Sequence, residues 1–316
     1  MNNSLEVLDH VRLNFSPAGL VFLNVALAFV MFGVALDIKV EHFTAILKKP
    51  KSAIVGFISQ TFLLPAFTFL LVILLNPTPT IALGMILVAA CPGGNISNFI
   101  SSMAKANVAL SVSLTAMSTM AAIVFTPFNF AFWGNLYIKY YNAHGAAGLV
   151  RTLEIDNYQM FQTVFILLGI PVILGLSIAQ KFPEFTERIR KPINKGSLAF
   201  FVLMVITLLV ANFSQFLSYM HLVFIFVLLQ NGLALAIGYL FSTIFKCSQK
   251  DRRTISIETG IQNSGLALAL MFNPKIFPPE LELGGMAIIA AWWGVWHIIS
   301  GLIIAWNWSR RPVIAL

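Results

Sequence analysis

Residues 91–98 read Cys-Pro-Gly-Gly-Asn-Ile-Ser-Asn and lie inside an apolar segment that runs from about residue 80 to 104. Proline and glycine there free backbone groups that hydrocarbon cannot satisfy, unless those groups line a protein-enclosed or water-filled cavity. A second polar cluster, Glu-Thr-Gly-Ile-Gln-Asn-Ser-Gly at residues 258–265, interrupts the apolar segment at about 254–273. Both segments are therefore predicted to be membrane helices that break near their middle.

The composition excludes a soluble globular protein. Of the 316 residues, 58% are hydrophobic and 10% are charged, and the mean hydropathy is +0.85. Soluble domains carry about 25% charged residues, so this chain has too few to cover a water-facing surface. Since each crossing needs about 20 apolar residues, the length leaves no room for a separate catalytic domain.

Apolar runs predict about nine transmembrane helices after a short charged tail at residues 1–16, which does not resemble a removable signal peptide. The runs lie at about 17–36, 52–75, 80–104, 108–134, 158–180, 196–212, 219–245, 254–273 and 284–309. The longest linker is predicted at about 135–157. The fold class is an all-α polytopic membrane protein.

The two interruptions fall in the third and eighth runs, which are five crossings apart. The chain therefore passes through the membrane in opposite directions at the two breaks. Paired interrupted helices in oppositely oriented halves are typical of transporters built from inverted repeats, with the binding site near the midplane. The alternative is that the glycines only allow close helix packing.

The distribution of basic residues predicts an N-terminus outside and a C-terminus inside. With this orientation only Arg12, Lys139, Arg151 and Lys275 fall outside, and the other 16 of the 20 Lys and Arg residues lie on the cytoplasmic side. The formal net charge of +8 then belongs to loops that face anionic membrane lipid, and no nucleic-acid partner is expected. We expect a multi-pass protein of the plasma membrane, with no obligate protein partner.

Glu258 is the acidic residue that falls inside a predicted crossing, and no Lys or Arg falls inside one. An ionised carboxylate at a helix centre costs about 2.5–3.5 kcal/mol on insertion scales, so it needs compensation. A bound metal ion or a proton could supply it. The alternative is that Glu258, five residues after Arg253 and so about 7–8 Å deep, extends toward the cytoplasmic interface.

Oxygen-bearing side chains accumulate around Glu258. Gln262 lies four residues after it, and Asn263 lies four residues after Thr259, so all would share one helical arc if the turn persists. Such oxygens favour hard cations, and one negative charge suits a monovalent ion, so Na⁺ fits best.

Two further polar features lie in neighbouring crossings. Ser111, Thr115 and Ser118 form a hydroxyl stripe with i, i+4, i+7 spacing, and Gln60 interrupts the second run. Each could simply bond a neighbouring helix.

A bound cation would make the cavity neutral or positive and would attract an organic anion. Half-helices that start near Asn95 and Asn263 could offer N-terminal amides to that anion. His297 is an intramembrane histidine that either packs by hydrogen bonding or relays a proton.

Six segments resemble the bile acid:sodium symporter family, and together they extend over nearly the whole chain. They are FGVALDIKVEHF (32–43), CPGGNISNF (91–99), NVALSVSLTAMST (107–119), LLQNGLALAIGYL (228–240), IETGIQNSGLALAL (257–270) and WWGVWHIISG (292–301). The resemblance implies inverted repeats sorted into a core bundle (51–134 and 219–309), which holds two crossed discontinuous helices, and a panel bundle (17–50 and 158–212).

The same resemblance implies two sodium sites. One would use Ser97, Asn98, Ser111, Thr115 and Glu258. The other would use Gln60, Glu258, Gln262 and backbone carbonyls near Thr259 and Ile261. Asn95, Asn263 and His297 fall in the expected substrate cavity, where His297-Ile298 departs from the His-Asn of bacterial relatives.

We therefore expect a secondary transporter, not an enzyme, that imports a bile-acid-like or smaller organic anion with about two Na⁺ by alternating access. A proton-coupled or uniporting carrier, in which Glu258 titrates, is the first alternative. An intramembrane hydrolase with Ser264 as nucleophile and His297 as base is a weaker alternative, because no GxSxG or HExxH motif is present. A passive channel would require a charged pore ring instead of a compact site.

Overall fold

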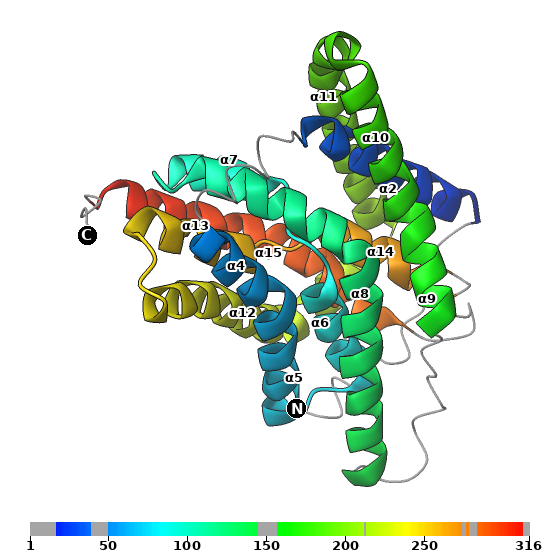
Figure 1. Cartoon of the computed structure of the whole chain (residues 1–316). Coiled ribbons are helices and arrows are strands. Elements are labelled where there is room, and N and C mark those ends of the chain that lie inside the picture. The colour runs from blue at the N-terminus through cyan, green and yellow to red at the C-terminus, as the bar shows by residue number, and fades with distance from the viewer. Residues whose placement is uncertain are drawn as a thin grey trace.

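A computed structural model describes residues 17–38, 50–144, 157–211, 213–273, 276–277 and 283–311 of the chain. Within these residues the regular structure is helical, and the one strand-like pairing is an isolated bridge between Gly93 and Gln262. Five helices are long and apolar enough to cross a membrane, and shorter apolar helices accompany them. The predicted all-α polytopic fold is confirmed (Figure 1).

The described helices follow the predicted apolar runs. In chain order they are α2 (Pro17–Asp37), α4 (Pro50–Ile58), η1 (Ser59–Leu63), α5 (Leu64–Leu75), α6 (Pro79–Ala90), α7 (Ile96–Met103), α8 (Val108–His144), α9 (Asn157–Val164), η2 (Phe165–Gly169), α10 (Ile170–Lys181), α11 (Pro183–Ala211), α12 (Phe213–Ile244), α13 (Gln249–Gly260), α14 (Ser264–Met271) and α15 (Gly284–Ser309). The elements η1 and η2 are π-helical segments that join their neighbours into continuous helices.

Both predicted interruptions are present. One helix breaks after α6 and the other breaks after α13. The 12-residue helices α6 and α13 are followed by the 8-residue helices α7 and α14, respectively. The first break begins where Cys91 adopts an extended backbone, which is the conformation that a following proline favours. The equal lengths of the halves are those expected of two related repeats.

The two breaks pair with each other through backbone hydrogen bonds. The Gly94 amide donates to the Ile261 carbonyl at 2.9 Å, and the Asn263 amide donates to the Pro92 carbonyl at 2.8 Å. These bonds satisfy backbone groups that the broken helices leave free, as burial in an apolar surrounding requires. The predicted crossing of two discontinuous helices is confirmed.

Gly93 lies close to the Gln60 and Glu258 side chains at the crossing. A Cβ atom at this position would lie 2.6 Å from the Gln60 amide nitrogen and 3.2 Å from Glu258 Oε2. Real Cβ atoms do not approach other atoms that closely, so a larger residue here would force the Gln60 side chain to shift.

The π-helical segments each end two residues before a proline. Leu63 precedes Pro65 by two residues, and Gly169 precedes Pro171 by two. Proline lacks the N–H that an α-helix needs and its ring crowds the carbonyl four residues earlier, so the preceding turn widens.

Two predicted boundaries are wrong. The predicted linker at 135–157 begins ten residues too early, because α8 continues as far as His144. The sixth predicted run starts too late, because α11 begins at Pro183, a residue suited to a first helical turn, with Glu184 in that turn. In both cases polar residues extend the helix beyond its apolar stretch.

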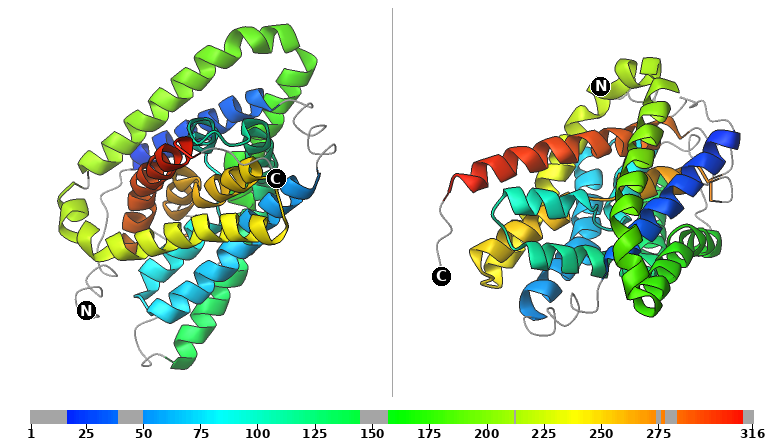
Figure 2. Two further views of the ribbon diagram at one scale, coloured as in Figure 1. Left: turned by 90° about the vertical axis from the view of Figure 1, so that its left-hand side faces the viewer. Right: turned by 90° about the horizontal axis from the view of Figure 1, so that it is seen from above.

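Helix α2 packs against α10 and α11, and these three helices gather on one side of the molecule (Figures 1 and 2). The two broken helices pack mainly among α8, α12 and α15, and α14 also contacts α2. The division into a panel and a core that move against each other stays a prediction.

Candidate cation site at the helix crossing

The Glu258 carboxylate lies in the last turn of α13 and is surrounded by hydroxyl groups. Ser97 donates to its Oε1 at 2.6 Å and Ser111 at 2.5 Å, while Thr115 lies 3.2 Å from Oε1 and 3.1 Å from Oε2. The residue is 1% exposed. The carboxylate therefore points into the protein, and the alternative in which it extends toward the interface is wrong.

Two helices, α7 and α8, bring these hydroxyls to Glu258 on α13. Ser97 lies one residue past the start of α7, and Ser111 and Thr115 occupy successive turns of α8, as the predicted stripe requires. Thr115 Oγ1 also lies 3.4 Å from the Asn98 side-chain oxygen. All five residues of the first predicted sodium site thus lie in one cluster.

Gln60 approaches the same residue from the other side. Its amide nitrogen donates to the Glu258 carbonyl at 3.1 Å, and the neighbouring Ser59 hydroxyl lies 3.0 Å from the Thr259 hydroxyl. The Gln60 side-chain oxygen is buried and has no hydrogen-bond partner among the described residues. The Gln60 amide is oriented so that its nitrogen donates to the Glu258 carbonyl. Its oxygen is therefore free to accept a hydrogen bond or to bind an ion.

The predicted arc through Glu258 and Gln262 is wrong, because α13 ends at Gly260 and the turn does not persist. Gln262 instead folds back, and its amide nitrogen donates to the Thr259 carbonyl at 2.8 Å. Its side-chain oxygen, like that of Gln60, is buried without a hydrogen-bond partner within the described part of the chain.

The carbonyls at the C-terminal end of α13 have separate donors. Gln60 bonds the carbonyl of Glu258, Gln262 that of Thr259, and Asn231 that of Gly260 at 2.8 Å. Asn231 in turn accepts from Ser300 on α15 at 2.6 Å. A helix end needs such partners for its last carbonyls, and its partial negative charge favours a cation.

The sequence alone did not assign Asn231, Ser59 or Ser300 to this site. Each is a polar side chain inside an apolar run. That pattern indicates that the side chain forms a hydrogen bond, but it does not identify the partner.

The predicted substrate residues lie near the same crossing but do not form one bonded group. Asn95 is exposed beside the start of α7, and Asn263 caps α14 by accepting from the Leu266 amide at 3.0 Å. His297 is buried on α15, with its ring 6.4 Å from that of Trp293. Among the described residues, no hydrogen bond joins His297 to either asparagine or to Ser264.

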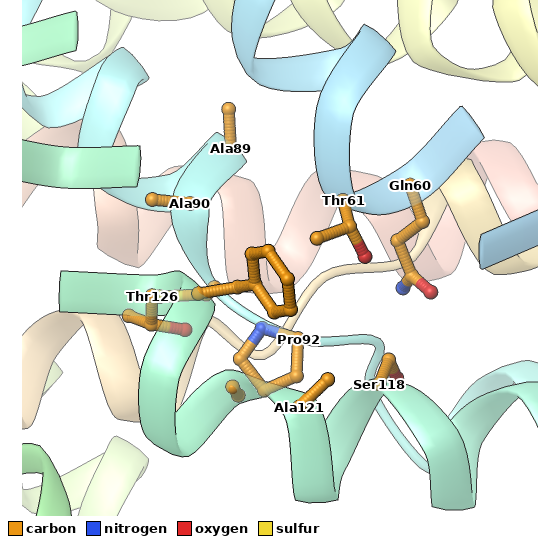
Figure 3. A pocket seen from close by; sticks show the side chains of 11 residues that line it. Gln60, Thr61, Ala89, Ala90, Pro92, Ser118, Ala121 and Thr126 are labelled. Atoms are coloured by element: carbon orange, nitrogen blue, oxygen red, sulfur yellow. The ribbon is translucent and has the colours of Figure 1, made fainter. Parts of the chain in front are cut away.

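A small cavity lies beside the crossing, between η1 and α8 (Figure 3). Gln60 and Thr61 extend into it from η1, Ser118 and Ala121 from α8, and the ring of Pro92 lies between the two elements. One side of the Gln60 environment is therefore not filled by protein atoms.

An all-α membrane protein with two crossed broken helices and a buried acid at their crossing has the organisation of a secondary transporter. Residues 24–219 match the Sodium Bile acid symporter family, and the chain belongs to this family. The expected family is thus confirmed.

Several relatives support the same assignment. The chain is 30% identical to the "Uncharacterized sodium-dependent transporter YocS" of Bacillus subtilis over 92% of its own length and 84% of the relative's. It is 32% identical to the "Probable sodium/metabolite cotransporter BASS1, chloroplastic" of Arabidopsis thaliana, over 90% and 66% of the two lengths. It is 28% identical to the human "Sodium/bile acid cotransporter 4", over 84% and 58%. The chain thus spans less than two thirds of the length of the plant and human relatives, and all three names describe sodium-dependent transport.

Proposed function

We propose that this chain is a sodium-coupled symporter that imports an organic anion by alternating access. The observation that carries the proposal is the buried Glu258 carboxylate, which has neutral oxygens and no cationic side chain within bonding distance among the described residues. A buried carboxylate is costly without a counter-charge, and Na⁺ supplies one.

The first sodium ion would bind between α7, α8 and α13. Ser97, Ser111 and Thr115 now donate to the carboxylate, and rotation of their hydroxyls would turn lone pairs toward an ion beside it. Asn98 would add a fifth oxygen. One charge among neutral oxygens matches a hard monovalent cation better than a divalent one.

The second sodium ion would bind between η1 and the break after α13. The free side-chain oxygens of Gln60 and Gln262 are its natural ligands, because their amide nitrogens are already engaged. Carbonyls near Thr259 and Ile261 and the Glu258 carboxylate would complete the set. Glu258 then belongs to both sites, which would couple the binding of about two ions.

The substrate we propose is an organic anion, either bile-acid-like or a smaller carboxylate. Two bound cations would offset the charge of Glu258 and leave the crossing positive, and the amide ends of α7 and α14 would add to this. Asn95, Asn263 and His297 are the candidate contacts. The names of the relatives, which mention metabolites and bile acids, agree with this class.

Alternating access would move the bundle at 17–50 and 158–212 against the bundle at 51–134 and 219–309. We place the N-terminus outside and the C-terminus in the cytoplasm of the plasma membrane. Large apolar side chains exposed on outer faces, such as Leu74 and Ile244, would contact lipid.

Uptake into proteoliposomes tests this function. Candidate anions are first screened for thermal stabilisation of the purified protein in NaCl against KCl, because a transported substrate should stabilise more in Na⁺. Those that pass should accumulate only with an inward sodium gradient. Equal accumulation in sodium-free buffer would reject sodium coupling, and dependence on a pH gradient instead would favour the proton-coupled alternative.

A further inference from the structure

The orientation of Gln60 depends on the π-helical segment η1. A π-turn adds a residue relative to an α-helix, and each residue turns the helix by about 100°. The side chains of Ser59 and Gln60 therefore point in other directions, relative to α5, than they would if the helix were α-helical throughout. In this orientation Ser59 meets Thr259 and Gln60 meets the Glu258 carbonyl.

The proline that follows the widened turn leaves the Thr61 carbonyl without its usual donor. Pro65 has no N–H, so it cannot bond to the carbonyl of Thr61, four residues earlier. The side-chain amide of Asn129 on α8 donates to this Thr61 carbonyl at 2.8 Å. Asn129 is 3% exposed, and the two residues are separated by 68 positions in the chain.

A second contact on the same face of α8 holds the same segment. Phe125, one turn before Asn129, packs its ring 5.3 Å from that of Phe62 and 5.9 Å from that of Phe57. The apolar contact fixes the position of η1 against α8, whereas the Asn129 hydrogen bond supplies the polar group that the π-turn requires.

We propose that Asn129 is a positioning residue for the second sodium site. It replaces the donor that Pro65 lacks, stabilises the π-turn, and so directs Gln60 at the end of α13 without touching the ion. This inference rests on the proposed function, since it assumes that Gln60 is a sodium ligand.

The test measures the NaCl concentration that half-saturates thermal stabilisation, with KCl holding the ionic strength constant. Loss of one buried hydrogen bond changes an equilibrium constant about three- to tenfold, so Asn129→Leu should raise the half-saturating concentration by about that factor. Ser113→Ala is the control, because Ser113 is buried on the same helix and its hydroxyl donates to the Ala109 carbonyl of that helix, away from Gln60. It should leave the concentration unchanged. A wild-type value for Asn129→Leu, even with a lower melting temperature in KCl, would overturn the proposal.

A double-mutant cycle with Gln60→Leu separates this inference from the proposed function. If Gln60→Leu alone leaves the half-saturating concentration unchanged, the second sodium site is wrong. If it raises that concentration, Asn129→Leu should add nothing further in the Gln60→Leu background. An independent further increase would show that Asn129 does not act through Gln60.

A third variant covers the case in which Asn129→Leu does not fold. Pro65→Ala restores a backbone N–H that can donate to the Thr61 carbonyl. Folded protein should then be recovered in Asn129→Leu combined with Pro65→Ala. No recovery would contradict the assignment of Asn129 to that carbonyl.

Discussion

Ser111 Oγ lies 2.5 Å from Glu258 Oε1, although 147 residues separate them in the chain. The contact joins α8 to the last turn of α13 and places a hydroxyl beside a carboxylate that no cationic side chain neutralises in the described structure. A short hydrogen bond to a charged acceptor is stronger than one between neutral groups. The proposed ion would therefore enter a site whose ligands are already in place.

Replacing Ser111 should weaken sodium binding without unfolding the protein. Ser111→Ala removes one oxygen ligand and one bond to the carboxylate, so the half-saturating NaCl concentration should rise by about tenfold. Ser113→Ala is the control, since Ser113 is also buried on α8 but donates to the Ala109 carbonyl of its own helix. Sodium titrations of thermal stability compare the two. Equal behaviour of the two variants would count against a cation site at this carboxylate.

Substitution of Gly93 should disturb both proposed sodium sites. In Gly93→Ala the new Cβ would lie 2.6 Å from the Gln60 amide nitrogen and 3.2 Å from Glu258 Oε2, so Gln60 must move. We expect at least a tenfold loss of apparent sodium affinity, consistent with about 1–3 kcal/mol of overpacking. In Gly232→Ala the added methyl meets nothing within 4 Å, and this variant should keep wild-type affinity. Uptake or sodium-dependent melting that survives Gly93→Ala unchanged would be incompatible with the described crossing.

Arg253 should affect stability and not sodium affinity. This residue is 1% exposed and donates to the carbonyl of Ala104, just beyond the C-terminal end of α7, and to that of Arg311. Its guanidinium also lies 5.9 Å from the Trp308 ring. Arg253→Met leaves the buried Ala104 carbonyl without this donor and should cost about 1–3 kcal/mol of unfolding free energy.

Arg188→Met, at an exposed position of α11, is the control for the Arg253 variant and should change the melting temperature little. Melting curves in KCl, followed by a sodium titration, distinguish the two effects. A changed sodium affinity with unchanged stability in Arg253→Met would assign that residue a different role.

Local sequence was enough to predict both breaks and the acid between them. Pro92 and the paired glycines cannot continue a helix in hydrocarbon, and an acid in a crossing must find compensation wherever it folds. The spacing of Ser111 and Thr115 placed both on one face of α8.

Other features depended on contacts between distant segments. The Gln262 side chain was predicted on a helical arc, yet the helix ends before it because its backbone pairs with the other break. The donors Asn231 and Asn129 bond carbonyls that lie 29 and 68 residues away. Side-chain type reveals the need for a partner, and only the packing of helices determines which one is within reach.

The predicted C-terminal end of α8 and the predicted start of α11 were wrong for a simpler reason. Hydropathy marks where apolar residues stop, whereas a helix continues until its backbone bonds or tertiary contacts end. A hydropathy boundary therefore gives the shortest extent of such a helix.

The most direct test titrates NaCl against the thermal stability of the wild-type protein and of Glu258→Gln, at constant ionic strength with KCl. Glu184→Gln, at an exposed position of α11, serves as the control. The wild type and the control should gain stability with the logarithm of the sodium concentration, as a ligand that binds only the folded state requires, and Glu258→Gln should show no gain. A sodium response of Glu258→Gln equal to that of the wild type would contradict the claim that this carboxylate binds the ion.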